Sequence, residues 1–318
     1  MPDATLEFPV IVIGHSAWDN VYRIAEFPDR PTKVRALEHA ASGGGVAANA
    51  AAAISRLGGR VELWSRVGGD RTGEDIIADL ARLRVGTSHV QIHPGARSST
   101  AAVIVDGAGG RLVIGERDHA MPSSLDGLPL DTVASAGAIL SDNAWREATV
   151  AAFLAAREAG VPCVLDVDVG AGHVPDEVLA LASHAIFSAP ALESRAEGGD
   201  LASALAAVRD LGRVHAGVTR GAEGYVWLGD DGQLQSQPPL LVPIVDTTGA
   251  GDAFHGAFTL ALARGFPDAE CARIASATAA LACRGLGARR SLPAWSEVDA
   301  LLRERTGRGI IDGAVSPP

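Results

Sequence analysis

From residue 134 onward the sequence alternates between short apolar runs and longer stretches of helical composition, and this alternation constrains the fold more than any other feature. The runs with strand character cover residues 138–141, 161–166, 185–188 and 215–219. Predicted helices at 149–159 and 201–211 lie between them. Strands that alternate with helices form a parallel sheet that is covered on both faces. We therefore predict an α/β fold with a doubly wound, mostly parallel sheet.

Polar residues follow the ends of these predicted strands. They are Asp142, Asp166, Asp168, Ser188, Thr219 and Asp246. In open α/β sheets, ligands bind beyond the carboxyl ends of the strands. Any one of these residues could simply cap a helix or a turn. Their agreement predicts that the functional site lies at this edge of the sheet.

One stretch, residues 246–258, carries the strongest chemical signal. It reads Asp-Thr-Thr-Gly-Ala-Gly-Asp-Ala-Phe-His-Gly-Ala-Phe. An apolar run with strand character, 240–245, precedes it, and an apolar helix is predicted at 253–263. Gly249, Ala250 and Gly251 have almost no side chain, so their N–H groups can approach a ligand. At a helix N-terminus, these donors and the helix dipole favour an anion.

Asp252 falls in the first turn of that helix, beside the predicted anion site. A carboxylate there can accept a proton from a hydroxyl while the backbone holds a phosphoryl group, which is what phosphoryl transfer to an alcohol requires. An ordinary helix N-cap is the alternative interpretation. A cap needs only one small polar residue, however, and not seven residues at fixed spacing.

The heptapeptide 246–252 resembles the C-terminal signature of the ribokinase-like (phosphofructokinase-B, pfkB) sugar kinases, and the resemblance extends over nearly the whole chain. It implies a ribokinase-like fold in which a small β-sheet lid accompanies the doubly wound sheet. It implies an ATP-dependent sugar kinase with Asp252 as the base. Gly249, Ala250, Gly251 and the backbone of Asp252 would form the anion hole.

A second motif, Ser-Gly-Gly-Gly-Val-Ala-Ala-Asn at 42–49, resembles the N-terminal signature of the same family. Its glycines and Glu62 also loosely resemble a dinucleotide fingerprint, but no apolar strand runs directly into the glycines. By the family resemblance, the substrate ligands are Asp19, Lys33, Gly44, Gly45, Asn49 and Asp252. Ribokinases proper have a lysine at the position of Val46, which argues against ribose as the substrate.

The predicted lid comes from segments 15–40 and 97–118, the second with two strands about a turn at 106–110. In the resembling family the lid edge often forms a dimer, so we expect a homodimer through the lid. Lys33 lies in the first segment and is the only lysine among 27 basic residues. Its persistence indicates either a need for a compact ammonium group or chance.

The nucleotide site is predicted mainly from the resemblance. The implied ATP-binding residues are Ser188, Thr219, Arg220, Gly221, Gly224, Gly249, Gly251 and Gly287; a plain β-turn is the alternative for 219–224. The family's Asn-x-x-Glu motif is replaced here, with Ser188 and Ala191 at its two positions. Mg²⁺ is therefore assigned to Asp166 or Asp168, through water. A monovalent cation such as K⁺ is implied at Asp246, Thr248, Ala282, Gly287 and Ser291.

The nearest branch by resemblance is the sulfofructose-kinase-like and fructokinase-like group, which shares the triple glycine, Trp145 and Lys33. Two of that group's three sulfonate-binding residues are absent, since Gly115 and Ala144 occupy their positions. We therefore expect a ketohexose or a related sugar, phosphorylated on a primary hydroxyl. A sulfofructose or sugar-phosphate kinase is the alternative. More distant alternatives are a nucleoside kinase, a non-catalytic sugar or nucleotide sensor, and an NAD-dependent dehydrogenase.

Composition narrows the class further. The chain has 318 residues, 47% hydrophobic and 20% charged, with a net charge of −11. An acidic balance argues against nucleic acid or an anionic membrane as a partner. Three unpaired cysteines in apolar stretches and the absence of a signal-peptide pattern indicate a cytoplasmic protein. We expect one kinase domain over residues 1–318, ending in a frayed tail at 312–318.

Overall fold

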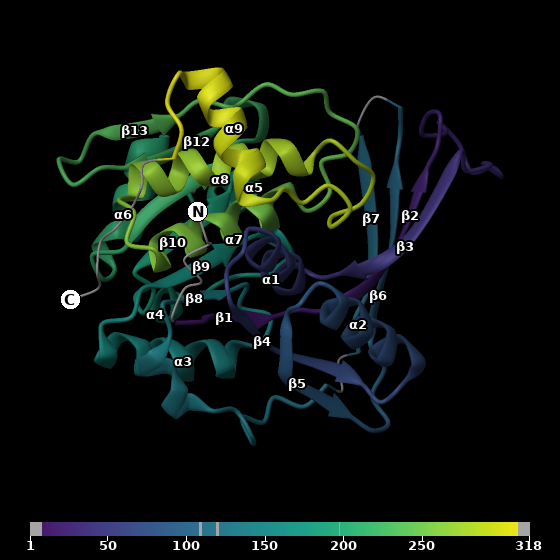
Figure 1. Ribbon diagram of the computed structural model, residues 1–318, viewed down its shortest axis with the longest axis horizontal. Helices are drawn as coiled ribbons and strands as arrows, with labels where there is room; N and C mark the ends of the chain where they lie inside the picture. Colours follow the sequence, from purple (N-terminus) through teal and green to yellow (C-terminus); the bar gives the residue numbers. More distant parts are fainter. Residues whose placement is uncertain (1–7, 108–109, 119–120, 197, 311–318) are drawn as a thin grey trace.

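The computed structural model describes residues 8–107, 110–118, 121–196 and 198–310, and the predicted tail at 312–318 lies outside them. Within this part of the chain, one sheet has nine strands in the order β13-β12-β11-β10-β9-β8-β1-β4-β5 (Figure 1). Its strands are β1 (Val10–Gly14), β4 (Val61–Gly68), β5 (Gly86–His93), β8 (Ala138–Ser141), β9 (Cys163–Val167), β10 (His184–Ser188), β11 (His215–Thr219), β12 (Tyr225–Leu228) and β13 (Leu234–Gln237).

All neighbours from β5 to β11 pair in parallel, and only β12 and β13 are antiparallel. Every residue of β1 is buried. Val10 and Val12 pack into one hydrophobic cluster, whereas Ile11 and Ile13 pack into the other. This alternation places a core on each face of the sheet and confirms the prediction of a doubly wound, mostly parallel sheet.

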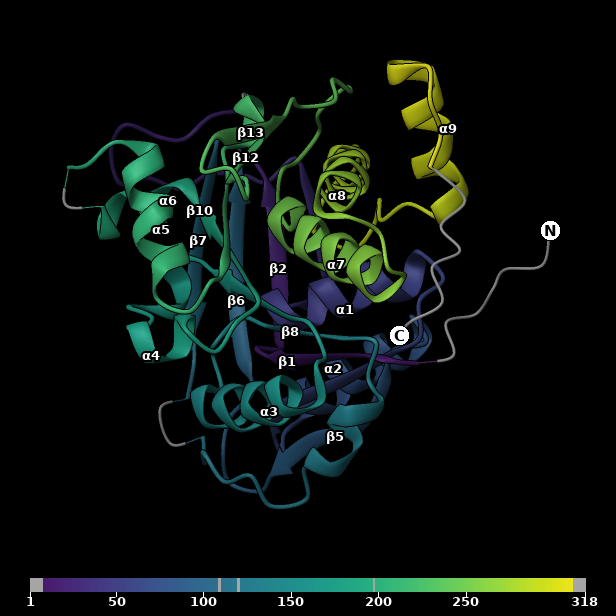
Figure 2. The same cartoon turned by 90° about the vertical axis from the view of Figure 1, so that its left-hand side faces the viewer.

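Two groups of helices cover the two faces, and Figure 2 shows α3–α6 on one side with α1, α7, α8 and α9 on the other. The first face is covered by α1 (Val46–Arg56), α2 (Arg71–Arg82), α7 (Ala250–Ala263), α8 (Asp268–Ala282) and α9 (Trp295–Thr306). The second is covered by α3 (Arg146–Ala159), α4 (Asp176–Leu179), α5 (Ala189–Arg195) and α6 (Leu201–Asp210). Short 3₁₀ turns occur at Leu130–Ser135, Val169–Ala171 and Gly221–Glu223. Within the described residues, none of the helices combines the length and the apolar character that crossing a membrane requires.

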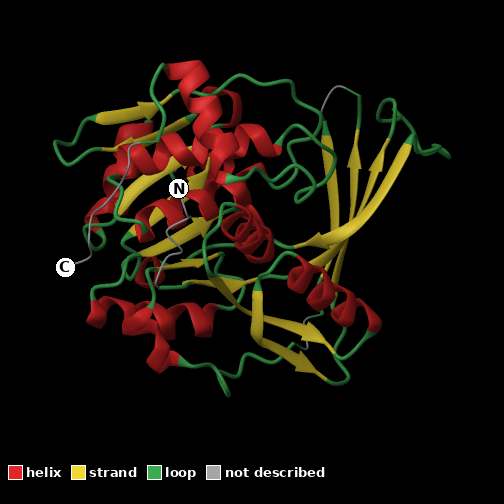
Figure 3. Cartoon of the chain, viewed as in Figure 1, coloured by secondary structure: helices red, strands yellow, loops and turns green. Residues whose placement is uncertain are grey.

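A separate four-stranded sheet projects from this body, in the order β3-β2-β6-β7 (Figure 3). Its strands are β2 (Ala17–Arg23), β3 (Glu38–Gly44), β6 (Ser99–Val105) and β7 (Arg111–Glu116). β2, β6 and β7 lie within the segments 15–40 and 97–118, whereas β3 begins in the first segment and continues to Gly44. Residues 24–37, between β2 and β3, form no strand.

The strand expected at 240–245 is wrong. This stretch is irregular and runs from β13 toward α7, with Leu241 and Ile244 largely exposed. Pro243 offers no N–H for a ladder. The N–H groups of Val245 and Asp246 instead donate to the carbonyl of Cys283, at 2.8 and 3.2 Å. The motif therefore enters α7 from a loop that is tied to the end of α8, and not from a strand.

Candidate active site

The two glycines that precede and open α7 have different structural roles. Gly249, the N-cap, has φ +75°, and a Cβ there would lie 2.4 Å from the Cβ of Ala288. A side chain at this position would be strained by its backbone and blocked by its neighbour. A Cβ on Gly251 would meet nothing within 4 Å. Gly249 therefore shapes the turn, and Gly251 borders open space in front of the helix N-terminus.

Asp252 lies in the first turn of α7, as predicted, and is partly buried. The Nδ2 group of Asn49, on α1, donates to Asp252 Oδ2 at 2.7 Å. Burial raises the pKa of Asp252 to about 7; the Asn49 hydrogen bond opposes the rise, and the charges of Asp142, Asp168 and Asp19 add to it. A carboxylate with a pKa near neutrality is suited to accept a proton at physiological pH.

Asp19 approaches the same site from the second sheet. It lies on β2, is buried, and pairs in register with Ser42 of β3. A Cβ on Gly44 would lie 2.1–2.3 Å from the atoms of its carboxylate, so this glycine leaves room for Asp19. Burial raises the pKa of Asp19 to about 6, and the charge of Arg289 opposes the rise. The structure thus brings together Asp19, Gly44, Asn49 and Asp252, four of the residues that the sequence analysis expects to bind the sugar.

Arg289 is a site residue that the sequence argument did not single out. Its Nε donates to Asn49 Oδ1 at 2.8 Å, its Nη1 to Asp79 Oδ2 at 2.7 Å, and its Nη2 to the carbonyl of Gly44 at 2.9 Å. Because the guanidinium occupies the amide oxygen of Asn49, the amide nitrogen faces Asp252. The only signal in the sequence was an arginine within a run of small residues before Ser291.

His255, one turn after the motif in α7, was also missed. Its Nδ1 lies 2.8 Å from the carbonyl of Gly251 and 3.2 Å from Asp166 Oδ2, and its Nε2 lies 3.3 Å from the carbonyl of Ile186. Burial lowers the pKa of His255. The ring thus connects the turn around Gly251 to β9 and β10. Its place beside the motif's aspartate and glycines was visible in the sequence, but its partners were not.

Three further aspartates line this edge of the sheet. Asp142 accepts the N–H groups of His15 and Ala47 with Oδ2, at 2.9 and 3.1 Å. Burial raises the pKa of Asp166 well above its usual value, and the charges of Asp252, Asp168 and Asp142 add to the rise. The accumulation of carboxylates leaves the site short of positive charge.

Ser188 joins the edge that carries these aspartates. Its Oγ donates to Asp168 Oδ1 at 2.7 Å and accepts the N–H of Ala191 at the start of α5. The hydroxyl of Ser188, at the position of the family's asparagine, thus caps the N-terminus of α5 and also donates to a carboxylate. It is adjacent to Asp168, one of the two residues predicted for Mg²⁺.

The predicted nucleotide turn has internal partners for two of its side chains. Arg220 forms an ion pair with Glu223 at 2.6 Å, and Thr219 Oγ1 donates to the carbonyl of Phe187. Gly221 and Gly224 have φ +53° and +88°, and a Cβ on Gly224 would lie 2.3 Å from a carbonyl of β13. The backbone conformation of the turn into β12 therefore accounts for both glycines without a bound nucleotide.

Three of the residues predicted for a monovalent cation, Asp246, Thr248 and Gly287, lie together. Asp246 Oδ1 accepts the N–H and hydroxyl of Thr248, at 2.9 and 2.7 Å, and Oδ2 accepts the N–H of Gly287 at 2.8 Å. Ser291 packs against Gly285, and a Cβ added at Gly285 would lie 2.0 Å from the Ser291 hydroxyl oxygen. Ala282 is the buried last residue of α8. Lys33, in contrast, is exposed in the irregular stretch between β2 and β3.

Comparison with known proteins identifies the class of protein that this fold and site define. The sequence profile of the pfkB family carbohydrate kinases matches residues 9–295. The chain belongs to this family and is a carbohydrate kinase, a phosphotransferase that acts on a sugar.

Individual relatives agree with this assignment. A ribokinase of Arabidopsis thaliana is 28% identical over 314 residues, covering 93% of this chain and 81% of its own length. The structure titled as Arabidopsis ribokinase complexed with ribose and ATP has a TM-score of 0.80 at 26% identity, covering 93% of this chain and 98% of that one. A ribokinase candidate from Agrobacterium tumefaciens has a TM-score of 0.88 at 32% identity, covering 95% and 99%. A fructokinase of Klebsiella pneumoniae is 30% identical over 283 residues, covering 79% and 88%.

Proposed function

We propose that the protein transfers the γ-phosphate of ATP to a primary hydroxyl of a ketohexose or a related sugar. One observation carries the proposal. Asp252 is held by Asn49 at the entrance of α7, next to the open space at Gly251. A base and an anion-binding helix N-terminus are thus adjacent, and phosphoryl transfer to an alcohol needs both.

In the proposed mechanism, Asp252 accepts the proton of the sugar hydroxyl as the oxygen attacks the γ-phosphorus. The bond from the γ-phosphorus to the β–γ bridging oxygen breaks, and ADP leaves. The N–H groups at the start of α7 stabilise the phosphoryl oxygens. Asn49 keeps the carboxylate oriented, and Arg289 in turn keeps the amide of Asn49 oriented. Asp19 binds hydroxyls of the same sugar from β2. The reaction needs no covalent intermediate with the protein.

The carboxylates at this edge would also suit Mg²⁺. Asp166 and Asp168 are two residues apart at the end of β9, and the charge of Asp168 adds to the raised pKa of Asp166. Hard oxygen ligands of this kind suit Mg²⁺ held partly through water. The ion would neutralise charge on the phosphates. Asp246, Thr248 and Gly287, with Ala282 and Ser291, remain our assignment for K⁺.

The identity of the sugar is the finer part of the proposal. Ribose is the second candidate, because several relatives are named ribokinases and one is titled as a complex with ribose and ATP. Val46 stands where ribokinases proper have a lysine, and a fructokinase is also among the relatives. Both observations favour a ketohexose. A sulfosugar or a sugar phosphate is retained as an alternative.

We further propose that the chain acts as one kinase domain whose second sheet closes over the sugar and excludes water. Leu112, Val113 and Ile114 of β7 are each about half exposed, at 48–59%. Apolar side chains this exposed on a sheet favour contact with the sugar on one face and a partner chain on the other. This supports the expected homodimer through the lid.

An ATP-consumption screen over ketohexoses, ribose, sugar phosphates, sulfosugars and nucleosides tests the proposed function. We expect the highest kcat/KM with a ketohexose and loss of turnover in Asp252→Asn. A strong preference for ribose would replace the sugar but keep the mechanism. Turnover of Asp252→Asn within a few-fold of wild type would remove Asp252 from the role of base.

A further inference from the structure

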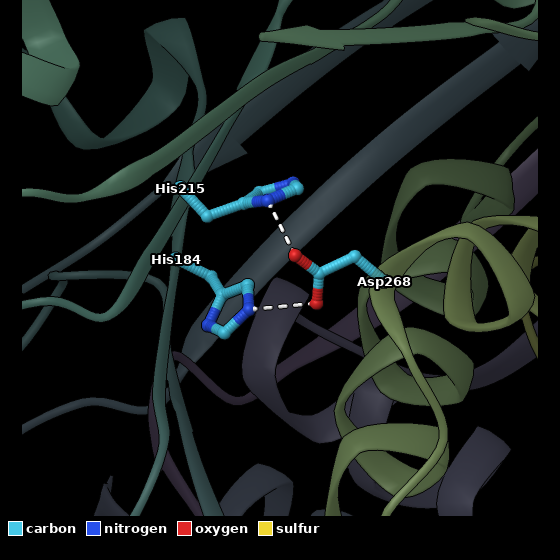
Figure 4. Close-up of side chains that lie close together, drawn as sticks. All are labelled: His184, His215 and Asp268. Atoms are coloured by element: carbon cyan, nitrogen blue, oxygen red, sulfur yellow. Dashed lines mark hydrogen bonds and ion pairs between the residues drawn. The ribbon is translucent and has the colours of Figure 1, made fainter. Parts of the chain in front are cut away.

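Two histidines and an aspartate converge at the edge of the sheet opposite the active site (Figure 4). His184 and His215 are the first residues of β10 and β11, which run parallel with these two residues in register. Their rings lie side by side, with centroids 4.9 Å apart. Asp268, the first residue of α8, places Oδ1 3.3 Å from His184 Nε2 and Oδ2 2.8 Å from His215 Nδ1.

Hydroxyl groups hold the remote nitrogen of each ring. Ser183 Oγ lies 2.8 Å from His184 Nδ1, while it also donates to the carbonyl of Cys163 and accepts the N–H of Cys163. Because the proton of Ser183 is donated to Cys163, its oxygen accepts a hydrogen bond from the Nδ1–H group of His184, and Nε2 is left to face Asp268. In the metal-free chain a proton on Nε2 joins the ring to the carboxylate oxygen, and a metal ion can replace that proton.

The second ring is held in the same way. The hydroxyl of Tyr225 lies 3.1 Å from His215 Nε2. Gly217 makes room for that hydroxyl, because a Cβ there would lie 2.0 Å from it. Histidines that bind metals have their other nitrogen fixed by a hydrogen bond in this manner. Both rings therefore present one oriented nitrogen to Asp268.

The spacing of these atoms fits a small transition-metal ion. The three ligand atoms lie within 4.8 Å of one another. With bonds of about 2.0–2.1 Å, the edge of a tetrahedral site is roughly 3.3–3.4 Å. The 3.3 Å between His184 Nε2 and Asp268 Oδ1 matches this edge, whereas the 2.8 Å between His215 Nδ1 and Asp268 Oδ2 is a hydrogen-bond distance that must lengthen when an ion binds. The imidazole side chains are 12% and 11% exposed and Asp268 is 41% exposed. Solvent can thus reach a fourth position past Asp268.

We propose that His184, His215 and Asp268 bind one Zn²⁺ ion per chain. Two imidazole nitrogens and one carboxylate favour Zn²⁺ over Mg²⁺, which prefers oxygen ligands in octahedral geometry. His184 is four residues from Ser188 along β10, roughly 13 Å away, so this site is separate from the proposed nucleotide site.

The bound ion joins β10, β11 and the start of α8. Phe258, on the helix that carries Asp252, packs against both imidazoles, with centroids 5.8 and 6.1 Å away. The ion therefore stabilises the packing of the C-terminal helices on the sheet, and it does so without contacting the reacting groups.

The test uses the full-length chain after removal of metals by a chelator. Zn²⁺ is titrated against a chromogenic chelator, and Co²⁺ is added as a probe whose visible absorption reports tetrahedral coordination. We expect one Zn²⁺ per chain, a tetrahedral Co²⁺ spectrum, and a higher Tm with Zn²⁺ because the ion binds the folded state. Excess Mg²⁺ should not displace the ion.

Three variants complete the experiment. Asp268→Asn and His184→Gln should each weaken Zn²⁺ affinity by at least about 10²-fold and abolish the rise in Tm. His173→Gln, at an exposed histidine elsewhere, should bind Zn²⁺ like wild type. Melting curves without metal verify that each variant folds. The proposal is wrong if wild type binds no stoichiometric Zn²⁺, or if Asp268→Asn binds it unchanged; the cluster is then a metal-free ion pair.

Discussion

Asp252 and Asp268 occupy similar local positions and have opposite electrostatic environments. Each lies in the first turn of a long helix, α7 or α8, where the helix dipole favours a carboxylate. At Asp252, burial and the neighbouring aspartates raise the pKa to about 7. At Asp268, burial acts in the same direction, but hydrogen bonds from His184 and His215 outweigh it and lower the pKa well below its usual range.

The contrast shows that tertiary neighbours, and not helix position, decide what an aspartate can do. The edge around Asp252 carries several carboxylates whose negative charges raise one another's pKa. The edge around Asp268 already contains basic groups that match its carboxylate. A base is therefore expected at the first edge and a stable ligand or ion pair at the second.

The largest expected effect is on catalysis at Asp252. Asp252→Asn removes the proton acceptor but keeps an oxygen toward Asn49, so the fold and ATP binding should persist. We expect kcat to fall by about 10² to 10⁴-fold, measured in a coupled ATP-consumption assay. A loss that appears only in KM would show that Asp252 binds substrate and does not act as the base.

The two glycines beside Asp252 provide a matched pair. Gly251→Ala places a methyl group in open space where phosphoryl oxygens would bind, so kcat should fall by about 10²-fold with little change in Tm. Gly249→Ala is strained at φ +75° and collides with Ala288, so it should lower the stability by about 1–3 kcal/mol. Equal effects of the two variants on Tm would contradict this division of roles.

The raised pKa of Asp252 predicts a pH profile. The deprotonated carboxylate is the active form, so kcat/KM should rise with pH through an apparent pKa near 7. Below that value it should fall about tenfold per pH unit. A profile that is flat between pH 5 and 8 would show that the carboxylate ionises at its ordinary value in the free enzyme.

Arg289 tests whether the orientation of Asn49 matters. Arg289→Lys keeps the charge but cannot reach Asn49, Asp79 and the carbonyl of Gly44 at once. We expect the KM for the sugar to rise about tenfold while the KM for ATP changes little. Arg290→Lys, at the exposed neighbour that contacts Glu38, is the control and should behave like wild type.

The smallest effect concerns stability and should have opposite signs at the two aspartates. Because the pKa of Asp252 is raised in the folded state, its contribution to stability falls as pH rises from about 4 to 7. At pH 8, Asp252→Asn should therefore be more stable than wild type by about 1 kcal/mol, a value reduced because the Asp252 side chain is partly exposed. Near pH 4 the variant and wild type should be equally stable. Metal-free Asp268→Asn loses an acceptor for two imidazoles and should be about 1 kcal/mol less stable at neutral pH. Denaturant unfolding at both pH values measures each difference.

Much of the fold and part of the site followed from the sequence. The apolar runs that alternate with predicted helices predicted the parallel sheet, because strands covered by helices on both faces are apolar on both faces. The spacing of Gly249, Gly251 and Asp252 predicted a helix N-terminus with a carboxylate in its first turn, because these properties belong to a few adjacent residues. The misassigned strand at 240–245 shows the limit: its apolar residues form a loop in which Leu241 and Ile244 are exposed, and Pro243 was the one local signal against a strand.

Only the tertiary structure decided the properties that depend on distant neighbours. Arg289 reaches Asn49 across 240 positions of the chain, and Asp268 meets His184 across 84. The pKa of each aspartate is set by charges and burial within a few ångströms, so residues far apart in sequence determine it. The local pattern established which groups were present, and the folded arrangement established which of them act as a base, a ligand or a support.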